Sequence, residues 1–170
     1  MRPQDIVILL KKVTNKGRQL LNGQIAKELG ISASEVSEAL ERCRIARLVD
    51  NSKQHVNILA LTEFLVHGLK YAFPVQPQNV VRGIATAISA SPMKEKIVAG
   101  KEQYVWPYAK GDMRGAAIAP LYKTVPTAVA GDSMLYSLLT LVDTLRIGRA
   151  REVEIARAEL NNILSGYDVQ

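Results

Sequence analysis

The stretch that decides the fold is Gln24-Ile-Ala-Lys-Glu-Leu-Gly-Ile-Ser-Ala-Ser-Glu-Val-Ser-Glu-Ala-Leu40. Ala26 is small, as is needed where two crossing helices approach closely, and Gly30 can adopt the left-handed backbone conformation of a sharp turn. Val36 and Leu40 lie one helical turn apart, so they share the side of a second helix that faces the core. The residues left facing outward are Ser34, Glu35, Ser37 and Glu38. The stretch therefore predicts two helices joined by a tight turn, the second of which is exposed along one side.

Apolar residues at helical spacing and polar turn residues extend this pattern in both directions. Upstream, residues 3–14 carry an apolar stripe at three- and four-residue spacing, which predicts a further helix. Downstream, the turn-rich segment Asp50–Lys53 lies between Leu48-Val49 and His55-Val56 and predicts a small hairpin. Asn57 is then suited to cap a helix that runs to about Tyr71 or Phe73. Residues 1–73 thus predict the order helix, helix, helix, hairpin, helix.

Residues 24–40, with the flanking helix and hairpin, resemble the winged helix-turn-helix domain of MarR-like bacterial transcriptional regulators. In such domains the second helix of the motif enters the major groove of DNA, and its N-terminal residues meet base edges. The resemblance implies a transcriptional regulator, a repressor in the simplest case, that binds a pseudo-palindromic operator in double-stranded DNA as a homodimer. The residues expected to face bases are Ser34, Glu35, Ser37 and Glu38. Those expected to hold phosphates are Lys16, Arg18, Asn22, Gln24, Lys27, Arg42, Arg44 and Lys53.

The charge pattern leaves a second function open. The net charge is +6, and the positive excess lies in residues 1–130, a distribution suited to a polyanionic partner. Glutamates on the outward side of the second helix repel phosphate, although a glutamate can accept a hydrogen bond from the amino group of cytosine. The alternative is a protein-binding module, such as the antitoxin-like partner of a protein from a neighbouring gene, that uses the winged helix as a scaffold.

Composition argues against an enzyme, a cofactor or a metal centre. The chain has one cysteine and two histidines, so neither an intrachain disulfide nor a cysteine-based zinc site is expected. Cys43 lies on the predicted apolar stripe and is expected to pack as a small apolar residue, a redox role being the weaker alternative. No glycine-rich phosphate loop, nucleophilic triad or pair of carboxylates is found. The apolar runs are shorter than the ~20 residues of a membrane span and residues 1–10 do not read as a signal peptide, so we expect a cytoplasmic protein.

Residues 74–131 contain six of the seven prolines, a density that excludes long helices. We expect an extended, proline-rich loop segment packed on the core. Within it, Arg82, Trp106 and Arg114 suggest an apolar pocket for an anionic effector or for the carboxylates of a partner. The alternative is an ordered coil that Trp106 anchors to the core.

Residues 132–170 return to helical periodicity. Asp132 is suited to cap a helix with a broad apolar stripe, Gly148 breaks it, and a second helix follows at the spacing of packed helices. We expect a C-terminal helical hairpin that either makes a dimer or covers the winged helix within one subunit. The prediction for the whole chain is a mainly α protein whose parts span residues 1–73, 74–131 and 132–170.

Overall fold

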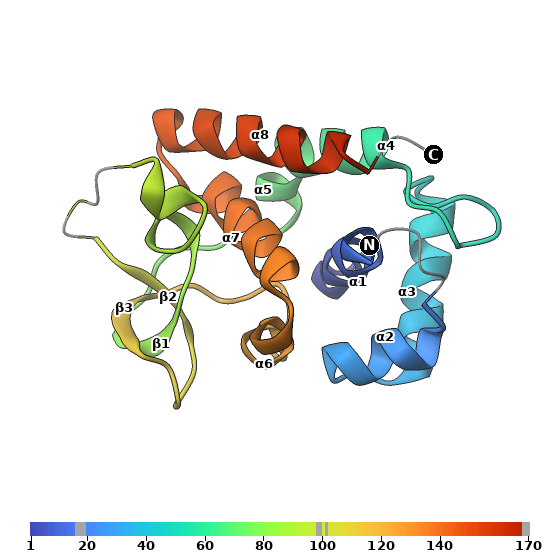
Figure 1. Ribbon diagram of the computed structural model, residues 1–170, viewed down its shortest axis with the longest axis horizontal. Helices are drawn as coiled ribbons and strands as arrows, with labels where there is room; N and C mark the ends of the chain where they lie inside the picture. The colour runs from blue at the N-terminus through green and yellow to red at the C-terminus, as the bar shows by residue number, and fades with distance from the viewer. Residues whose placement is uncertain (16–19, 98–99, 101, 168–170) are drawn as a thin grey trace.

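The computed structural model describes residues 1–15, 20–97, 100 and 102–167, and its architecture is α/β (Figure 1). The longer helices are α1 (Pro3–Thr14), α2 (Asn22–Leu29), α3 (Ala33–Ile45), α7 (Ser133–Ile147) and α8 (Ala150–Ser165). Shorter helical segments are α4 (Ile58–Glu63), a π-helical turn (Phe64–Gly68), α5 (Leu69–Ala72) and α6 (Val125–Ala128), with 3₁₀ turns at Ala87–Ser89, Met93–Glu95 and Val129–Gly131. The strands are β1 (Val80–Ala85), β2 (Tyr104–Pro107) and β3 (Met113–Ala117).

The predicted fold class, mainly α with an extended middle segment, is wrong, because the middle of the chain forms a three-stranded mixed sheet. β1 is antiparallel to both β2 and β3, and β2 is parallel to β3, so the sheet closes on itself. The prolines lie where a missing backbone N–H is accepted. Pro107 is the last residue of β2, and Pro126 lies in the first turn of α6. Gly83 permits the close approach of β1 to β2, since a Cβ there would overlap the carbonyl group of Trp106. A high proline density excludes long helices, but it does not exclude short strands.

The hairpin predicted between α3 and α4 is reduced to a single bridge pair, Val49 with Val56. The loop is closed instead by Asp50, whose Oδ1 accepts hydrogen bonds from the backbone N–H groups of Gln54 at 2.9 Å and His55 at 3.1 Å. A loop closed by a side-chain acceptor needs no strand ladder. The winged architecture expected for residues 1–73 is therefore not shown.

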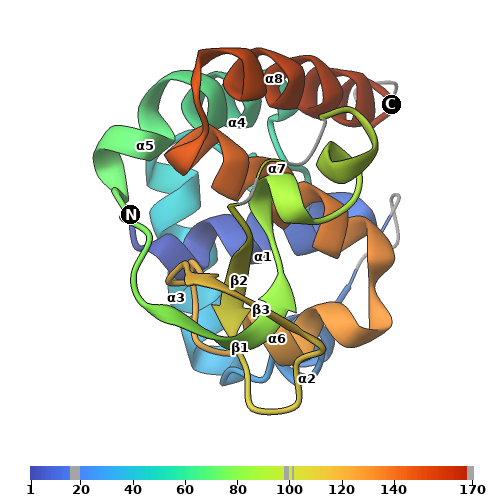
Figure 2. The same ribbon diagram turned by 90° about the vertical axis from the view of Figure 1, so that its left-hand side faces the viewer.

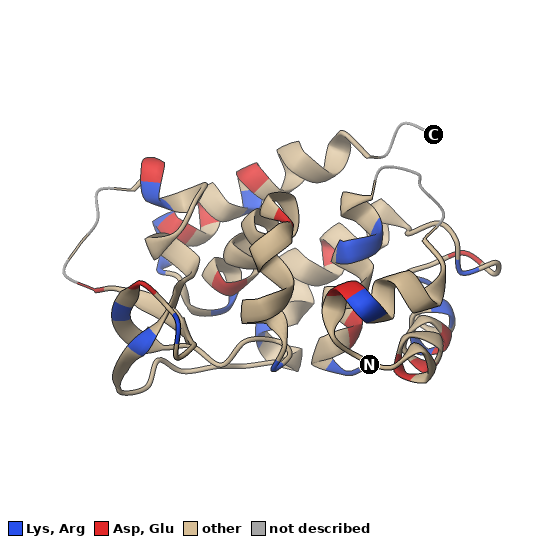
Figure 3. Ribbon diagram, turned by 60° about the horizontal axis from the view of Figure 1, so that its bottom comes forward, with Lys and Arg blue, Asp and Glu red and all other residues tan. Residues whose placement is uncertain are grey.

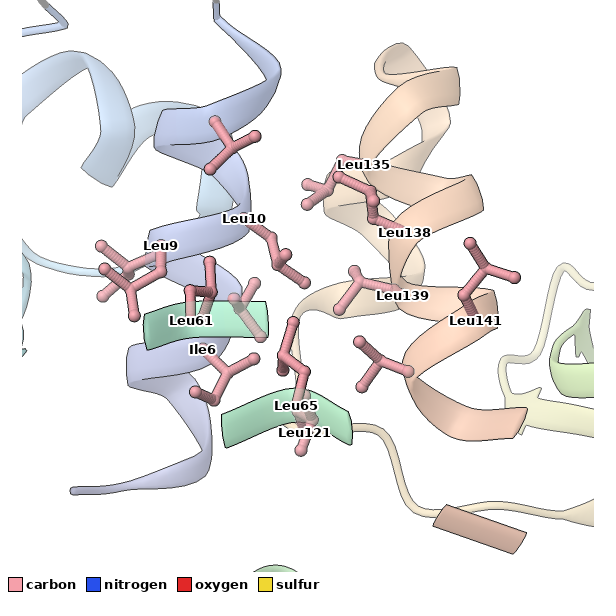
Figure 4. Close-up of a cluster of buried hydrophobic side chains, with 14 of the residues drawn as sticks. Ile6, Leu9, Leu10, Leu61, Leu65, Leu121, Leu135, Leu138, Leu139 and Leu141 are labelled. Carbon is pink, nitrogen blue, oxygen red and sulfur yellow. The ribbon is translucent and has the colours of Figure 1, made fainter. Parts of the chain in front are cut away.

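α7 is the central helix of the molecule, and α8, the helix that follows it, packs against it. The residues from Leu138 to Leu145 are all buried. Figure 4 shows side chains of α1 and α7 meeting between the two helices, with Leu138 on the side of α1 and Leu141 on the opposite side. The sheet lies on that opposite side (Figure 2), where the Tyr136 hydroxyl donates a hydrogen bond to the Ala85 carbonyl at 2.7 Å. The apolar stripe of α7 is broad because both sides of the helix are covered.

α8 packs along α7 and α4, so the apolar spacing expected to make a dimer is used inside the subunit. Its buried side consists of Ala156, Leu160 and Leu164. In the described part of the chain, the exposed large apolar side chains lie on elements other than α8. The outward side of α8 is polar and does not offer a dimer seam.

A buried polar cluster joins the sheet to α7. Asp143 Oδ2 accepts hydrogen bonds from Trp106 Nε1 at 2.6 Å and from the Thr86 hydroxyl at 2.9 Å. The other oxygen accepts from Arg146 at 2.8 Å, and Arg146 also donates to two backbone carbonyl groups. Buried charged groups are tolerated where hydrogen-bond partners of opposite charge or polarity are supplied. The cluster therefore holds β2 and the 3₁₀ turn after β1 in a defined position against α7.

Candidate nucleic-acid interface

α3 is anchored by one side and exposed on the other. Gly30, with φ 64°, ends α2 in the left-handed region and turns the chain into α3. Ser32 caps α3, since its hydroxyl accepts a hydrogen bond from the backbone N–H of Glu35 at 3.2 Å. The buried side of the helix consists of Val36, Ala39, Leu40 and Cys43. Exposed on the other side, at the three- and four-residue spacing of one helical face, are Ser34, Ser37 and Glu38.

Glu35 was predicted to face bases, but the structure uses it to cap the helix. Its Oε2 accepts hydrogen bonds from the backbone N–H and the hydroxyl of Ser32, both at 3.0 Å. These hydrogen bonds from Ser32 lower the pKa of Glu35. A carboxylate engaged in a capping box stabilises the start of the helix and is not free to accept from a base. The base-facing set is thereby reduced to Ser34, Ser37 and Glu38.

The residues predicted to hold phosphates fall into three groups. Outside the described residues lie Lys16 and Arg18. Exposed on α2 are Asn22, Gln24 and Lys27. Engaged with carboxylates of the same chain are Arg42, Arg44 and Lys53. Basic and acidic residues are interspersed along α2 and α3, so these helices do not present a surface of positive charge alone (Figure 3).

Arg42 is a structural residue and is not available to a phosphate. Its Nε and Nη2 donate to the two oxygens of Asp5, at 2.9 and 2.7 Å, and the Asp5 side chain is completely buried. This two-pronged pair joins α3 to α1. Since Asp5 has no access to water, withdrawing Arg42 toward DNA leaves a buried carboxylate without its counter-ion. Arg42 therefore does not belong to the candidate interface.

Arg44 and Lys53 share one acidic partner at the exposed end of α3. Glu41 Oε1 accepts from Arg44 at 2.6 Å, and Glu41 Oε2 lies 2.7 Å from the Lys53 ammonium. The hydrogen bonds from Arg44 and then Lys53 lower the pKa of Glu41 to about 2. The carboxylate thus occupies the place that a phosphate oxygen would take, and both cations remain at the surface where their partner can be exchanged.

Arg47 is the cation at the end of α3 that remains free. It is exposed, it has no ion-pair partner among the described residues, and its backbone lies in the left-handed region with φ 59°. Glycine is the usual residue at such a position after a helix, because a side chain there costs roughly 1 kcal/mol. Arg47 lines an open pocket of about 600 Å³ together with Arg44, Asn51 and His55.

The structure adds one cation that sequence reasoning missed. Lys123 is exposed and belongs to the connection between β3 and α6. It lies close enough to Glu35 to add to the lowering of that pKa, which Ser32 mainly causes. No local pattern links residue 123 to residue 35, because their proximity arises from the packing of distant segments.

The three residues predicted to line an effector or partner pocket do not come together. Arg82 on β1 lies directly opposite Arg114 on β3, and both are exposed. Trp106 is only 1% exposed and donates its indole N–H to Asp143, so it anchors the sheet and does not meet solvent. The two arginines form a like-charged pair that has no acidic partner within the described ranges.

Two further features concern metal ions and the thiol of Cys43. No group of three or more His, Cys, Asp or Glu residues there is arranged to hold a metal ion. Cys43 is buried, and burial raises the pKa of its thiol to about 12, so the reactive thiolate is scarce at neutral pH. Of the helices described, none has the length and apolar character needed to cross a bilayer.

Comparisons of the chain with protein-family models, with curated proteins and with solved structures found no match.

Proposed function

We propose that this chain is a sequence-specific transcriptional regulator that binds double-stranded DNA and reads the major groove with α3. The observation that carries the proposal is the exposed side formed by Ser34, Ser37 and Glu38, on a helix whose other side is buried. The major groove admits an α-helix, and the N-terminal residues of such a helix meet base edges. Serine hydroxyls both donate and accept hydrogen bonds, and Glu38 is suited to accept from the amino group of cytosine.

Exposed cations around α3 support the proposal. Lys27 on α2, Arg47 after α3 and Lys123 before α6 have no ion-pair partner among the described residues. Phosphate contacts supply a large part of DNA affinity and fix the orientation of the protein on the duplex. Arg44 and Lys53 add to this set when Glu41 gives way to a phosphate.

We further propose that two copies act in the cytoplasm as a repressor on a pseudo-palindromic operator. One α3 contacts few base pairs, and a two-fold dimer doubles the contacts at half-sites about one DNA turn apart. Since α8 offers no apolar seam, the dimer has to use another surface, and exposed apolar side chains available for it are Leu21, Ile45, Leu59 and Tyr71. Sedimentation equilibrium with and without operator measures the stoichiometry, and one copy per complete operator contradicts the dimer.

The test of the DNA-binding function is selection of duplexes from a random-sequence pool by the full chain, followed by titration of the enriched duplex at several salt concentrations. We expect one common sequence to be enriched, and the logarithm of the affinity to fall linearly with the logarithm of the salt concentration. Ser37→Ala should relax the preference at one base position, whereas Lys27→Gln should weaken binding to all sequences alike. A pool without enrichment, or a preference unchanged by Ser34→Ala and Ser37→Ala together, contradicts the proposal.

Glu41 offers a sharper test, because its carboxylate competes with phosphate for Arg44 and Lys53. Glu41→Gln removes one negative charge, so the net charge that Arg44 and Lys53 present rises by one, and we expect binding about fivefold tighter at 150 mM salt and a steeper salt dependence. The matched control is Glu95→Gln, an exposed glutamate in the 3₁₀ turn between β1 and β2. Unchanged or weaker binding by the Glu41 variant places the C-terminal end of α3 outside the interface.

A second function, binding of an acidic protein partner, is favoured by the pair Arg82 and Arg114. Like charges directly opposite one another on neighbouring strands destabilise a sheet, and arginine is suited to bind carboxylates through two hydrogen bonds. Native purification from cells should then recover a stoichiometric partner that Arg82→Ala and Arg114→Ala together release. Retention of the same partner by the double variant excludes this surface.

A further inference from the structure

The connection between β3 and α6 contacts the turn between α2 and α3, which sets the direction of α3. The Thr124 hydroxyl donates a hydrogen bond to the carbonyl of Leu29, the last residue of α2, at 2.6 Å and across 95 residues of sequence. The Thr124 methyl group lies 3.5 Å from the position that a Cβ on Gly30 would take. A carbonyl at a helix end needs a donor, and here a threonine of a distant segment provides it. The turn that leads into α3 is thus held partly by Thr124.

Lys123 extends this contact to the exposed side of α3. The residue precedes Thr124 in the chain, so its Cα is fixed next to the α2–α3 turn while its side chain is exposed. Lys123 is close enough to Glu35 to contribute to the lowering of its pKa, which Ser32 mainly causes, and that carboxylate already accepts two hydrogen bonds from Ser32. The described residues contain no carboxylate within ion-pair distance of Lys123. A lysine ammonium on a flexible stem, held at this place, is a typical phosphate contact.

We propose that Lys123 binds a backbone phosphate of the DNA beside the N-terminal end of α3, and that Thr124 positions it there. The inference rests on the proposed DNA-binding function and deepens it, because it makes the interface composite. Residues 22–53 supply the helix and some of the cations, and the connection after the sheet supplies a further cation. A motif confined to residues 24–40 cannot reveal such a contact.

The experiment titrates the full chain and Lys123→Gln with the selected duplex between low and high salt. Loss of one phosphate contact should lower the salt slope by about 0.9, which corresponds to about fivefold weaker binding at 150 mM salt and to little change near 1 M. Lys123→Arg keeps the positive charge and should restore the slope. Lys110→Gln is the control, because Lys110 is likewise exposed but lies in the connection between β2 and β3.

A scan of the duplex with single uncharged methylphosphonate groups locates the contact. At one position of the duplex, a methylphosphonate group should weaken binding of the unmodified protein but not of Lys123→Gln. The variant lacks the ammonium group that would contact this phosphate, so loss of the phosphate charge has no further effect. Thr124→Val keeps the shape of the side chain but loses the hydroxyl. Because Thr124 positions Lys123, this change should weaken binding more in the unmodified protein than in Lys123→Gln, and an equal loss in both overturns the positioning role.

The outcomes separate the two proposals. If the unmodified chain binds a selected duplex and Lys123→Gln keeps its affinity, slope and methylphosphonate pattern, the role of Lys123 is overturned and the DNA-binding function stands. If the unmodified chain binds no duplex, the DNA-binding function itself fails. Equal melting temperatures of the two proteins show that the fold is intact, as expected for an exposed side chain.

Discussion

α3 and α7 are helices of similar length, 13 and 15 residues, but α3 exposes polar side chains whereas α7 buries them. α3 exposes serines and charged residues along one side, and its carboxylate Glu41 holds two surface cations. α7 buries Asp143 and Thr144 among leucines, with the aspartate bonded to three donors. Ion pairs at the surface are worth little and can change partners, whereas buried ones are costly to break. Function is therefore expected from α3 and stability from α7.

The largest effect is expected when the carboxylate at the centre of α7 is removed. Asp143→Ala leaves the buried guanidinium of Arg146 without its counter-ion and two further donors without an acceptor. We expect the free energy of unfolding to fall by about 3–5 kcal/mol, measured by denaturant titration. Ser137→Ala, on the same helix but half-exposed, is the control and should stay within about 0.5 kcal/mol of the unmodified protein. An equally small effect at Asp143 would contradict the structural role of the cluster.

Arg42 is an exception on α3, because its partner Asp5 is buried as the polar groups of α7 are. A substitution at Arg42 should therefore affect stability. Arg42→Ala should lower the free energy of unfolding by about 2–4 kcal/mol, since Asp5 keeps its buried charge without the guanidinium. Arg151→Ala removes an exposed arginine of α8 and should change little. The double variant Asp5→Ala, Arg42→Ala should lose less than the sum of the two single variants. Strict additivity would show that the pair contributes no coupling.

Sequence reasoning reached the elements that local features determine. Apolar periodicity and the turn at Gly30 both act within a few residues, so α1, α2 and α3 lie where they were predicted. The sheet was missed because its pairing is non-local: the residues of β1 pair with residues of β2 and β3 that lie twenty or more positions further along the chain. The loss of Arg42 from the candidate site and the gain of Lys123 have the same cause, since both depend on contacts between distant segments.

Cys43, on the buried side of α3, predicts a loss of stability at alkaline pH. Burial raises the pKa of its thiol from 9.0 to about 12, so between these values the unfolded chain has released a proton that the folded chain still holds. Stability then falls as the pH rises above 9, by about 1.4 kcal/mol per pH unit from this group, and the effect is absent below about pH 8. Denaturant titrations of the unmodified protein and Cys43→Ala at pH 7 to 10 measure it as a diverging difference. If the stability of the two proteins instead changes with pH in parallel, folding does not raise the pKa of the thiol.

A substitution at Arg47 is expected to change stability least, and it should affect stability and DNA binding in opposite directions. Its backbone N–H donates to the carbonyl of Arg44 at 3.0 Å and the N–H of Leu48 donates to that of Cys43 at 2.9 Å, the hydrogen bonds of a helix end that favours glycine. Arg47→Gly removes the strain of a side chain at φ 59°, so we expect the free energy of unfolding to rise by about 0.5–1 kcal/mol. The same change removes a cation, so binding to the selected duplex should weaken about fivefold at 150 mM salt.

Arg47→Lys completes this test, because it keeps both the charge and the strain. It should match the unmodified protein in stability and keep the salt slope of DNA binding. A more stable Arg47→Gly that binds DNA as before would remove Arg47 from the interface, and a less stable one would contradict the left-handed turn. A gain in stability together with a loss of affinity, by contrast, means that the strain at the end of α3 is retained because the arginine is needed at the surface.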